Sequence, residues 1–413
     1  MTTSTSDLPI SETIEPASVT ELANVIREAY DRREAIYPVG GGTSLNYGLP
    51  AQQPGLAVQM RAISRIIDYP VGDMTITVEA GMTMSALQEK LRAEGQQLPL
   101  DVPHSETATI GGVLATNHNG PRRWGFGTAR DYVIGIGAVD GCGRRFSGGG
   151  RVVKNVAGYD FCKLLVGSLG TLGVITEITL KVKPLATRRE ILVGQPDNLD
   201  HAESVLATMV QSKTYPTALE LVGGTSWQSA PELNGDSDRD WLIAVLEGTD
   251  SEVNWMVSQL QSEWQSQQIK NQQLVTRDQQ ASLFQQLVDF PAAADAPLVL
   301  KANVVPSGTT AMIKAARALE TDCSIHAHAG NGIVYLRFPE FPAQGISRVV
   351  TSNLRPLAIA HHGNVVVMSN PSGQEMTRQS TWGGIDEPFW MMDRIKEQFD
   401  PLNLLNPGRY IYS

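Results

Sequence analysis

The chain of 413 residues has little cysteine and no excess of positive charge. Its three cysteines, Cys142, Cys162 and Cys323, are far apart, so they form neither a disulfide framework nor a set that binds an iron–sulphur cluster. The net charge of −10 and the pI of about 5.3 argue against nucleic acid or an anionic membrane as the main partner. Any iron–sulphur cluster that works with this protein must be on another chain.

The sequence also lacks long apolar runs. None reaches the roughly 18 consecutive apolar residues of a membrane-spanning helix. The first nine residues have neither the basic region nor the apolar region of a signal peptide. Hydrophobic residues make up 42% and charged residues 18%, as in ordinary globular proteins. We therefore expect a cytoplasmic protein that reaches a membrane only through its partners.

The first part of the chain alternates predicted helices and strands with short connections. Residues 1–16 are expected to form a flexible polar tail. Apolar residues at helical spacing predict a helix over 17–33, with Ser18 as its N-cap. Further strands are predicted at 35–39, 56–60, 75–80 and 174–182, and a helix at 84–94. This pattern is typical of a sheet domain with helices, here over 17–184.

Glycine is concentrated in loops that precede Pro184. Gly40, Gly41 and Gly42 directly follow the predicted strand that ends at Val39. Consecutive glycines allow backbone N–H groups to form a concave nest that binds an anion, typically a phosphate. More glycine-rich segments follow over 104–174, which predicts a large flat ligand lying against the main chain. The alternative is that these glycines only make tight turns and sheet corners.

The second part of the chain differs in composition. After about residue 186 glycine becomes rarer and glutamine commoner, notably over 259–286, which we interpret as a solvated helix face. Helices are predicted at 201–212, 251–268 and 309–320, and strands at 217–222, 241–247, 298–304 and 333–338. This order is typical of a split βαβ cap domain. A final helix and a tail rich in proline and asparagine are expected over 389–410.

Five motifs together resemble one protein family. They are VGGGTS at 39–44, TIGGVLATN at 109–117, VKNVAGYD at 153–160, GSLGTLGVITE at 167–177, and FDP with LNPGR over 399–409. The chain resembles flavoproteins with a vanillyl-alcohol-oxidase-type FAD domain, in the branch of D-lactate dehydrogenases and glycolate oxidases. This resemblance implies an α+β fold, with a PCMH-type FAD-binding domain over 17–184 and an α+β cap domain over 185–413. The C-terminal tail would return to the flavin.

The resemblance also implies how FAD is bound. The motifs contain no GxGxxG fingerprint, so a Rossmann-type nicotinamide site is disfavoured. Non-covalent FAD is expected, because Thr43 and Ser44 occupy a loop that often carries an attaching histidine in this superfamily. Backbone N–H groups of residues 39–44 would hold the pyrophosphate. The expected FAD-binding residues are Val39, Gly40, Gly41, Gly42, Thr43, Ser44, His104, Thr109, Gly111, Gly112, Gly120, Gly125, Thr128, Gly158, Asp160, Gly167, Gly170, Thr171 and Ile175.

Two histidines are candidates for catalysis. His326 and His328 are two residues apart on an expected strand, so they point the same way and could hold a metal together. In the hydroxyacid-oxidising relatives that this chain resembles, a His-x-His-x-Gly-Asp-Gly-Asn segment and a later Glu–His pair form the metal and substrate site. Here Asn331 stands in the Asp position, and residues 365–368 are apolar. We therefore expect no bound metal; the alternative for both histidines is a packing role.

The substrate carboxylate would need a basic partner, and Arg337 and Arg409 are candidates, with a surface salt bridge as the alternative for each. The pattern resembles the smaller flavin subunits of glycolate oxidase complexes. This implies oxidation of glycolate or D-lactate to the 2-oxo acid, with a homologous flavin subunit and an iron–sulphur subunit as partners. The alternatives are an electron-relay or assembly subunit, a stand-alone 2-hydroxyacid dehydrogenase, and an interaction module without FAD.

Overall fold

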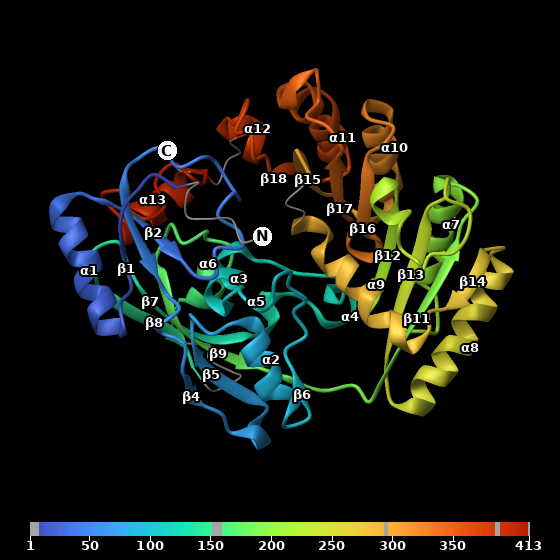
Figure 1. Cartoon of the computed structure of the whole chain (residues 1–413), viewed down its shortest axis with the longest axis horizontal. Coiled ribbons are helices and arrows are strands. Elements are labelled where there is room, and N and C mark those ends of the chain that lie inside the picture. The colour runs from blue at the N-terminus through green and yellow to red at the C-terminus, as the bar shows by residue number, and fades with distance from the viewer. Residues whose placement is uncertain (1–7, 151–158, 293–295, 385–388, 412–413) are drawn as a thin grey trace. The chain divides into compact units, whose positions relative to one another are not determined.

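The computed structural model describes residues 8–150, 159–292, 296–384 and 389–411, which form two compact units (Figure 1). Unit 1 comprises residues 1–119, 128–185 and 384–413, and unit 2 comprises 120–127 and 186–383. The change of unit at 185/186 lies next to the domain boundary expected at 184/185. Two segments differ from that expectation: 120–127 belongs to unit 2, and the C-terminal segment belongs to unit 1.

Unit 1 contains two main sheets. A parallel sheet has the strand order β1–β3–β2, and an antiparallel sheet has the order β4–β5–β9–β7–β8. The strands β6 and β10 form a separate, short antiparallel pair. The strands are β1 (Ile10–Ile14), β2 (Ala35–Val39), β3 (Gly55–Gln59), β4 (Ile66–Asp68), β5 (Thr75–Glu79), β6 (Gln96–Gln97), β7 (Val133–Val139), β8 (Arg145–Gly149), β9 (Val174–Lys181) and β10 (Lys183–Pro184).

The helices of unit 1 are α1 (Val19–Arg32), α2 (Met84–Arg92), α3 (Ile110–Thr116), α5 (Ala129–Tyr132), α6 (Phe161–Leu165) and α13 (Phe389–Phe399), with a 3₁₀ turn η2 (Val71–Asp73). Helix α1 begins where the sequence predicts it. The Ser18 hydroxyl accepts a hydrogen bond from the N–H of Glu21, and the Glu21 carboxylate accepts one from Ala17. Its apolar face, including Leu22 and Ile26, packs against β2 and β3.

The expectation of a flexible tail over residues 1–16 is wrong for its later part. Residues 10–14 form β1, which pairs in parallel with β3, so that Ile10 lies opposite Gly55. The polar side chains of this short strand resemble those of a tail, since its middle residues, Ser11 to Thr13, are exposed. Its partner is distant in sequence, and local patterning cannot show such pairing.

The C-terminal segment joins unit 1 through backbone contacts. Ile36 of β2 donates its N–H to Leu404, and Asn406 donates its N–H to Ile36, which makes a parallel bridge between Ile36 and Leu405. The Leu405 side chain is fully buried in the core under α1. Gly141 donates its N–H to Phe399 at the end of α13. These contacts explain why the segment is not part of the cap.

Unit 2 is built on one antiparallel sheet of eight strands in the order β14–β11–β13–β12–β16–β17–β15–β18. The central position of β16 brings two late-sequence histidines beside an early strand of the unit. The strands are β11 (Arg188–Gln195), β12 (Ala218–Gly223), β13 (Trp241–Gly248), β14 (Lys270–Leu274), β15 (Leu298–Asn303), β16 (Ser324–His328), β17 (Ile333–Phe338) and β18 (Asn364–Ser369).

Helices cover both faces of this sheet. The face that carries Leu219 and Leu221 packs against α7, α8 and α10, with Trp264 of α8 fully buried. The opposite face is partly covered by α9, through Leu283 and Phe284. The helices of the unit are α4 (Arg123–Phe126), α7 (Leu199–Met209), α8 (Asp250–Ser266), α9 (Arg277–Asp289), α10 (Thr309–Leu319), α11 (Arg355–Ala360) and α12 (Arg378–Trp382), with a π-helical segment η7 (Ser347–Leu354).

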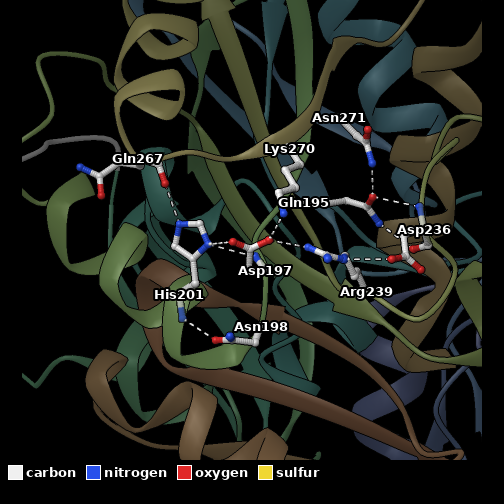
Figure 2. Close-up of polar contacts among 9 residues, drawn as sticks. All are labelled: Gln195, Asp197, Asn198, His201, Asp236, Arg239, Gln267, Lys270 and Asn271. Carbon is white, nitrogen blue, oxygen red and sulfur yellow. Dashed lines mark hydrogen bonds and ion pairs between the residues drawn. The ribbon is translucent and has the colours of Figure 1, made fainter.

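A polar network ties the β11–β14 edge of the sheet to the loop before β13 (Figure 2). The Asp197 carboxylate accepts a hydrogen bond from Nη1 of Arg239 and forms an ion pair with Nζ of Lys270, each at 2.6 Å. Arg239 also donates to Asp236 at 2.9 Å. The buried Gln195 side chain bonds the backbone of Asp236. Within the ranges that the structure describes, no helix has both the length and the apolar character needed to cross a membrane.

Candidate active site

The first glycine loop lies against the segment that leads into α3. A Cβ atom on Gly40 would lie 2.1 Å from the Thr109 hydroxyl, and one on Gly41 would lie 1.8 Å from the carbonyl oxygen of Thr107. Gly42 has φ of +74°, in the left-handed region that favours glycine. The structure therefore brings the predicted segments 39–44 and 109–112 together, and the glycines at 40 and 41 are required for this approach.

The donors of this loop fit an anionic ligand. Among the described residues, the N–H groups of Gly41, Thr43 and Ser44 donate to no backbone carbonyl. The residues of this loop are half-buried. Successive N–H groups without a backbone partner are the arrangement that binds phosphate in anion nests. This observation fits the FAD pyrophosphate that the motif implies.

The second glycine loop, 167–171, is held in an unusual backbone conformation. Gly167 and Gly170 have φ of +86° and +65°, and Leu169 between them has φ of +52°, which is uncommon for a leucine. Ser168 is buried, and within the described residues its hydroxyl has no hydrogen-bond partner. Buried hydroxyls are normally satisfied, so Ser168 fits a polar group of the cofactor. Ser168 is part of the GSLGTLGVITE motif but is not among the FAD-binding residues expected from the sequence.

The other predicted FAD residues lie in several settings. Thr109 caps α3, where its hydroxyl accepts from the N–H of Gly112, and a Cβ on Gly111 would lie 2.8 Å from that of Ala80. Thr171 and Ile175 are buried in unit 1. His104 has φ of +54°. Thr128 is the N-cap of α5 and Asp160 is the N-cap of α6. Gly120 and Gly125 belong to unit 2. Gly158 lies outside the described residues.

Unit 2 gathers ionisable side chains on one face of its sheet. Register pairs Lys301 with Tyr335, Tyr335 with His326, and Glu220 with His328. Directly paired residues, and residues two apart on one strand, point to the same face. We call the five side chains Glu220, Lys301, His326, His328 and Tyr335 the polar face of unit 2. They come from four adjacent strands, β12, β16, β17 and β15.

Glu220 lies between the two histidines. Its Oε2 is 2.7 Å from His326 Nε2 and 2.6 Å from His328 Nδ1, and all three side chains are buried. An ionised carboxylate only accepts hydrogen bonds, so each imidazole donates to it and is fixed in one ring orientation. The three residues offer ligand atoms within 4.8 Å of one another, so they could also hold a divalent cation. The expectation that no metal is bound stays a prediction.

The surroundings of His326 keep its ring neutral. Burial lowers its pKa, and this outweighs the opposite effect of the Glu220 carboxylate. Within the described residues, the buried Nδ1 of His326 has no hydrogen-bond partner. The rings of Trp227, Phe290 and Tyr335 pack around it at centroid distances of 5.8, 5.5 and 6.2 Å. A neutral imidazole held by a carboxylate can accept a proton from a hydroxyl group.

Lys301 supplies positive charge on the same face. Its ammonium nitrogen lies 5.9 Å from the centroid of the Tyr335 ring. Burial, together with the positive charge of Arg123 on α4, lowers the pKa of Lys301 to about 8. The positive charges of Lys301 and Arg123 repel each other, and an anion bound near both of them would relieve that repulsion. Lys301 and Arg123 thus form a candidate site for a carboxylate.

The two arginines predicted to bind the substrate make other contacts. Arg337 donates from Nε to the carbonyl oxygen of Phe290 at 2.7 Å, and its guanidinium lies over the Phe290 ring at 4.3 Å. Arg409 is buried in unit 1 and donates to the carbonyl oxygens of Leu45 and Tyr47. These contacts position loops, and a role in binding the substrate carboxylate stays a prediction for both.

Sequence reasoning missed Glu220 and Lys301. Each is the single charged residue within an apolar segment of predicted strand: Glu220 in ALELV at 218–222, and Lys301 in LVLKA at 298–302. Such residues are rarely buried unless they are paired or functional, so the pattern could have marked them. Their contact with the histidines depends on strand order, which the sequence alone does not show.

Two family matches agree with this geometry. Residues 10–148 match the FAD binding domain, and residues 373–410 match the C-terminal domain of FAD linked oxidases. The glycolate oxidase subunit GlcE of Escherichia coli is 37% identical over 176 residues, which is 41% of this chain and 50% of that protein. The glycolate oxidase subunit GlcD of Bacillus subtilis is 31% identical over 51% of this chain and 44% of that protein. The matches therefore span half or less of these relatives.

Two further comparisons cover nearly the whole chain. The D-lactate dehydrogenase of Archaeoglobus fulgidus is 26% identical over 96% of this chain and 90% of that protein. The solved structure of an alkyldihydroxyacetonephosphate synthase superposes with a TM-score of 0.70 at 18% identity, covering 96% of this chain and 76% of that one, which shows the fold alone. The motifs, the fold and these matches agree: the chain has an FAD-binding domain and the C-terminal domain of FAD-linked oxidases, and its cofactor is FAD.

Proposed function

We propose that this chain oxidises a small 2-hydroxyacid, glycolate or D-lactate, to the 2-oxo acid as the FAD-binding subunit of a glycolate oxidase complex. The main support is the polar face of unit 2, where the half-buried Lys301 lies on the same face of the sheet as the buried Glu220, His326 and His328. A 2-hydroxyacid has a carboxylate that would bind the lysine and a hydroxyl that would contact a histidine held by the Glu220 carboxylate. The relatives described as glycolate oxidase subunits and D-lactate dehydrogenase act on acids of this class by name.

The residues of this face would divide the work as follows. Lys301, with Arg123, binds the substrate carboxylate. His328, whose ring is 5.5 Å from that of Tyr335, accepts the hydroxyl proton. Glu220 accepts a hydrogen bond from the Nδ1–H of His328, so the lone pair of the imidazole that accepts the proton is on Nε2. The Glu220 carboxylate also stabilises the imidazolium that forms when His328 is protonated.

When bound, FAD supplies the oxidising group that accepts the hydride from the α-carbon of the substrate. The proposed partners are a homologous flavin subunit and an iron–sulphur subunit, which would carry the electrons onward. The two relatives named as glycolate oxidase subunits support this assembly. The chain's three cysteines are too few for a four-cysteine cluster site, so the cluster would belong to the partner.

A second candidate is an electron-relay flavin subunit that oxidises no substrate itself. The observation that favours it is on β18, the edge strand beside Lys301. Val366 lies opposite Lys301, and Val366 and Met368 are half-buried apolar residues, in the stretch where the enzymes that the chain resembles carry a Glu–His pair. Without a Glu–His pair on β18, the polar face of unit 2 would stabilise the fold but would not catalyse substrate oxidation.

The deciding experiment is anaerobic reduction of the purified FAD-loaded chain by glycolate, followed through the visible flavin absorbance band. Loss of the band with the isolated chain supports a working substrate site, and a comparison of D-lactate with L-lactate serves as the stereochemical control. Loss of the band only after the partner subunits are added supports the relay function. The Lys301→Met variant should abolish the direct reaction, whereas Lys213→Met, at an exposed loop position, should retain it.

A further inference from the structure

We infer that the C-terminal segment 400–410 is a clamp that positions both glycine loops for FAD, and that its docking and FAD binding strengthen each other. This rests on the FAD site of unit 1 and not on the proposed substrate. The segment contacts the pyrophosphate loop through Arg409 and the second glycine loop through Asn406. Neither side chain is proposed to bind FAD itself. Each one fixes the backbone of a loop, and the loop binds FAD.

Arg409 fixes the end of the pyrophosphate loop. Its Nη2 donates to the carbonyl oxygen of Tyr47 at 2.8 Å and also to that of Leu45. In return, Leu49 donates its N–H to the carbonyl oxygen of Arg409 at 3.0 Å. Charge-assisted hydrogen bonds to carbonyls are stronger than neutral ones. Residues 45–49 are thereby held on both sides immediately after Thr43 and Ser44.

Asn406 fixes the strained position of the second loop. Its Nδ2 donates to the carbonyl oxygen of Leu169 at 2.8 Å, and Leu169 has φ of +52°. A Cβ on Gly170 would lie 3.0 Å from the same Nδ2, so the amide also fits closely over the loop. Strained backbone persists only where surrounding contacts hold it. The amide of Asn406 is such a contact, beside the buried Ser168 hydroxyl.

Lys396 and Asp400 anchor the clamp to the same loop. The Lys396 ammonium donates to the carbonyl oxygen of Thr171 at 2.8 Å and to the Asp400 carboxylate at 2.6 Å. The Asp400 carboxylate also accepts the N–H groups of Leu404 and Leu405, at 3.0 and 2.7 Å. The segment thus leaves α13 in one defined direction. A ligand that requires both loops in place must also favour the docked segment, because coupling between two binding events is reciprocal.

The first test measures FAD affinity of the apo chain by flavin fluorescence, which needs no substrate. Asn406→Gly keeps the left-handed conformation (φ of +45°) but removes the amide donor, and we expect FAD binding to weaken about fivefold to tenfold. Asn403→Gly is the matched control: Asn403 has φ of +51° in the same segment, and among the described residues its side chain makes no hydrogen bond. Equal FAD affinity in the two glycine variants would overturn the clamp.

Arg409 provides a second comparison. Arg409→Met should weaken FAD binding more than Asn406→Gly, because it removes two hydrogen bonds to the pyrophosphate loop. Arg409→Lys keeps a cationic donor and should recover part of that loss. A merely structural role would instead lower the apo unfolding temperature in all Arg409 variants without changing FAD affinity below that temperature, and this result would contradict the clamp.

A test on the unaltered chain avoids misfolded variants. Limited trypsin digestion with and without saturating FAD is followed by mass spectrometry, comparing cleavage after Lys396 and Arg409 with cleavage after Lys213 in unit 2. We expect FAD to slow cleavage in the C-terminal segment selectively, by at least about tenfold relative to Lys213. An unchanged ratio of the two rates would show that the segment docks independently of FAD, while failure of glycolate to reduce the flavin would leave this result unaffected.

Discussion

Lys301 and Tyr335 face each other across the β15–β17 strand pair, with the ammonium nitrogen 5.9 Å from the ring centroid. Burial raises the pKa of Tyr335 to about 12 and lowers the pKa of Lys301 to about 8. The phenol therefore stays protonated over the whole physiological range, and the lysine is the group of this pair that titrates near neutrality. The pair thus combines a constant hydrogen-bond donor with a cation whose charge depends on pH.

Glycolate affinity should fall as the pH rises through about 8. The pKa of Lys301 is lowered, so its ammonium form, which attracts a carboxylate, is lost from about pH 8 upward. The measurement is the glycolate concentration that gives half-maximal anaerobic flavin reduction at pH values on both sides of 8. Lys301→Arg should remove this alkaline limb, because arginine stays charged. A flat profile in the unaltered chain would show that Lys301 does not bind the carboxylate.

Glu220→Gln should slow flavin reduction by at least about 100-fold with little change in the half-saturating glycolate concentration. The amide keeps the shape of the side chain but removes the negative charge that orients and stabilises the imidazoles of His326 and His328. Stopped-flow absorbance measures the rate. Glu190→Gln, a buried acid on β11 of the same sheet, is the control and should react normally. A loss of affinity without a loss of rate would count against the assigned role.

Gly41→Ala should lower FAD occupancy of the purified chain. The added Cβ would lie 1.8 Å from the carbonyl oxygen of Thr107, so the pyrophosphate loop must move. The ratio of flavin to protein absorbance, with the FAD dissociation constant of the apo chain, provides the readout. Gly72→Ala is the matched control in unit 1, because a Cβ there meets nothing within 4 Å. Normal FAD binding by Gly41→Ala would show that the loop does not hold the cofactor.

Lys396→Met should destabilise unit 1 by about 3–5 kcal/mol, because it leaves the buried carboxylate of Asp400 without its cation. Burial lowers the pKa of Lys396 and Asp400 opposes this, as expected for a pair that is buried together. Denaturant unfolding of the apo chain measures the effect. The double variant with Asp400→Asn should lose less than the sum of the two single variants, and strict additivity would exclude direct coupling.

Asp197→Asn should lower the stability of unit 2 only at pH values where the native carboxylate is ionised. Hydrogen bonds from Lys270 and Arg239 lower the pKa of Asp197 to about 2, below its unfolded value of about 3.9 (Figure 2). The stabilisation is therefore complete above about pH 4 and is lost as the pH falls toward 2. Denaturant midpoints of both chains across this range test it. High salt should shrink the difference, since the carboxylate is partly exposed.

Much of the fold follows from local sequence patterns. The Ser18 cap with Glu21 places the start of α1, and the alternation of Thr75 to Glu79 gives β5. The confirmed fold class and FAD cofactor depended on motifs in loops, where glycine is required by close backbone contacts such as Gly41 against Thr107. These features are local, so the sequence carries them directly.

The remaining features depend on long-range pairing. The strand β1 was missed because its partner β3 lies beyond α1 and β2. Glu220 meets His326 and His328 only because β16 inserts next to β12, although more than one hundred residues separate them in sequence. Arg409 was predicted to bind substrate because arginine suits a carboxylate, and this stays a prediction, whereas its hydrogen bonds to the carbonyls of Leu45 and Tyr47 could not be foreseen. Residue type alone does not determine which acceptor is nearest.

The chain leaves unit 1 at 119/120 and at 185/186, and it returns at 127/128 and at 383/384. Ribosomes make proteins from the N-terminus, so the two glycine loops emerge long before Asn406 and Arg409 are made. During translation, unit 2 can form its eight-stranded sheet while the loops of unit 1 still lack the side chains that hold them. The flavin site should consequently be one of the last parts of the nascent protein to mature, and FAD should be captured after synthesis has passed residue 409.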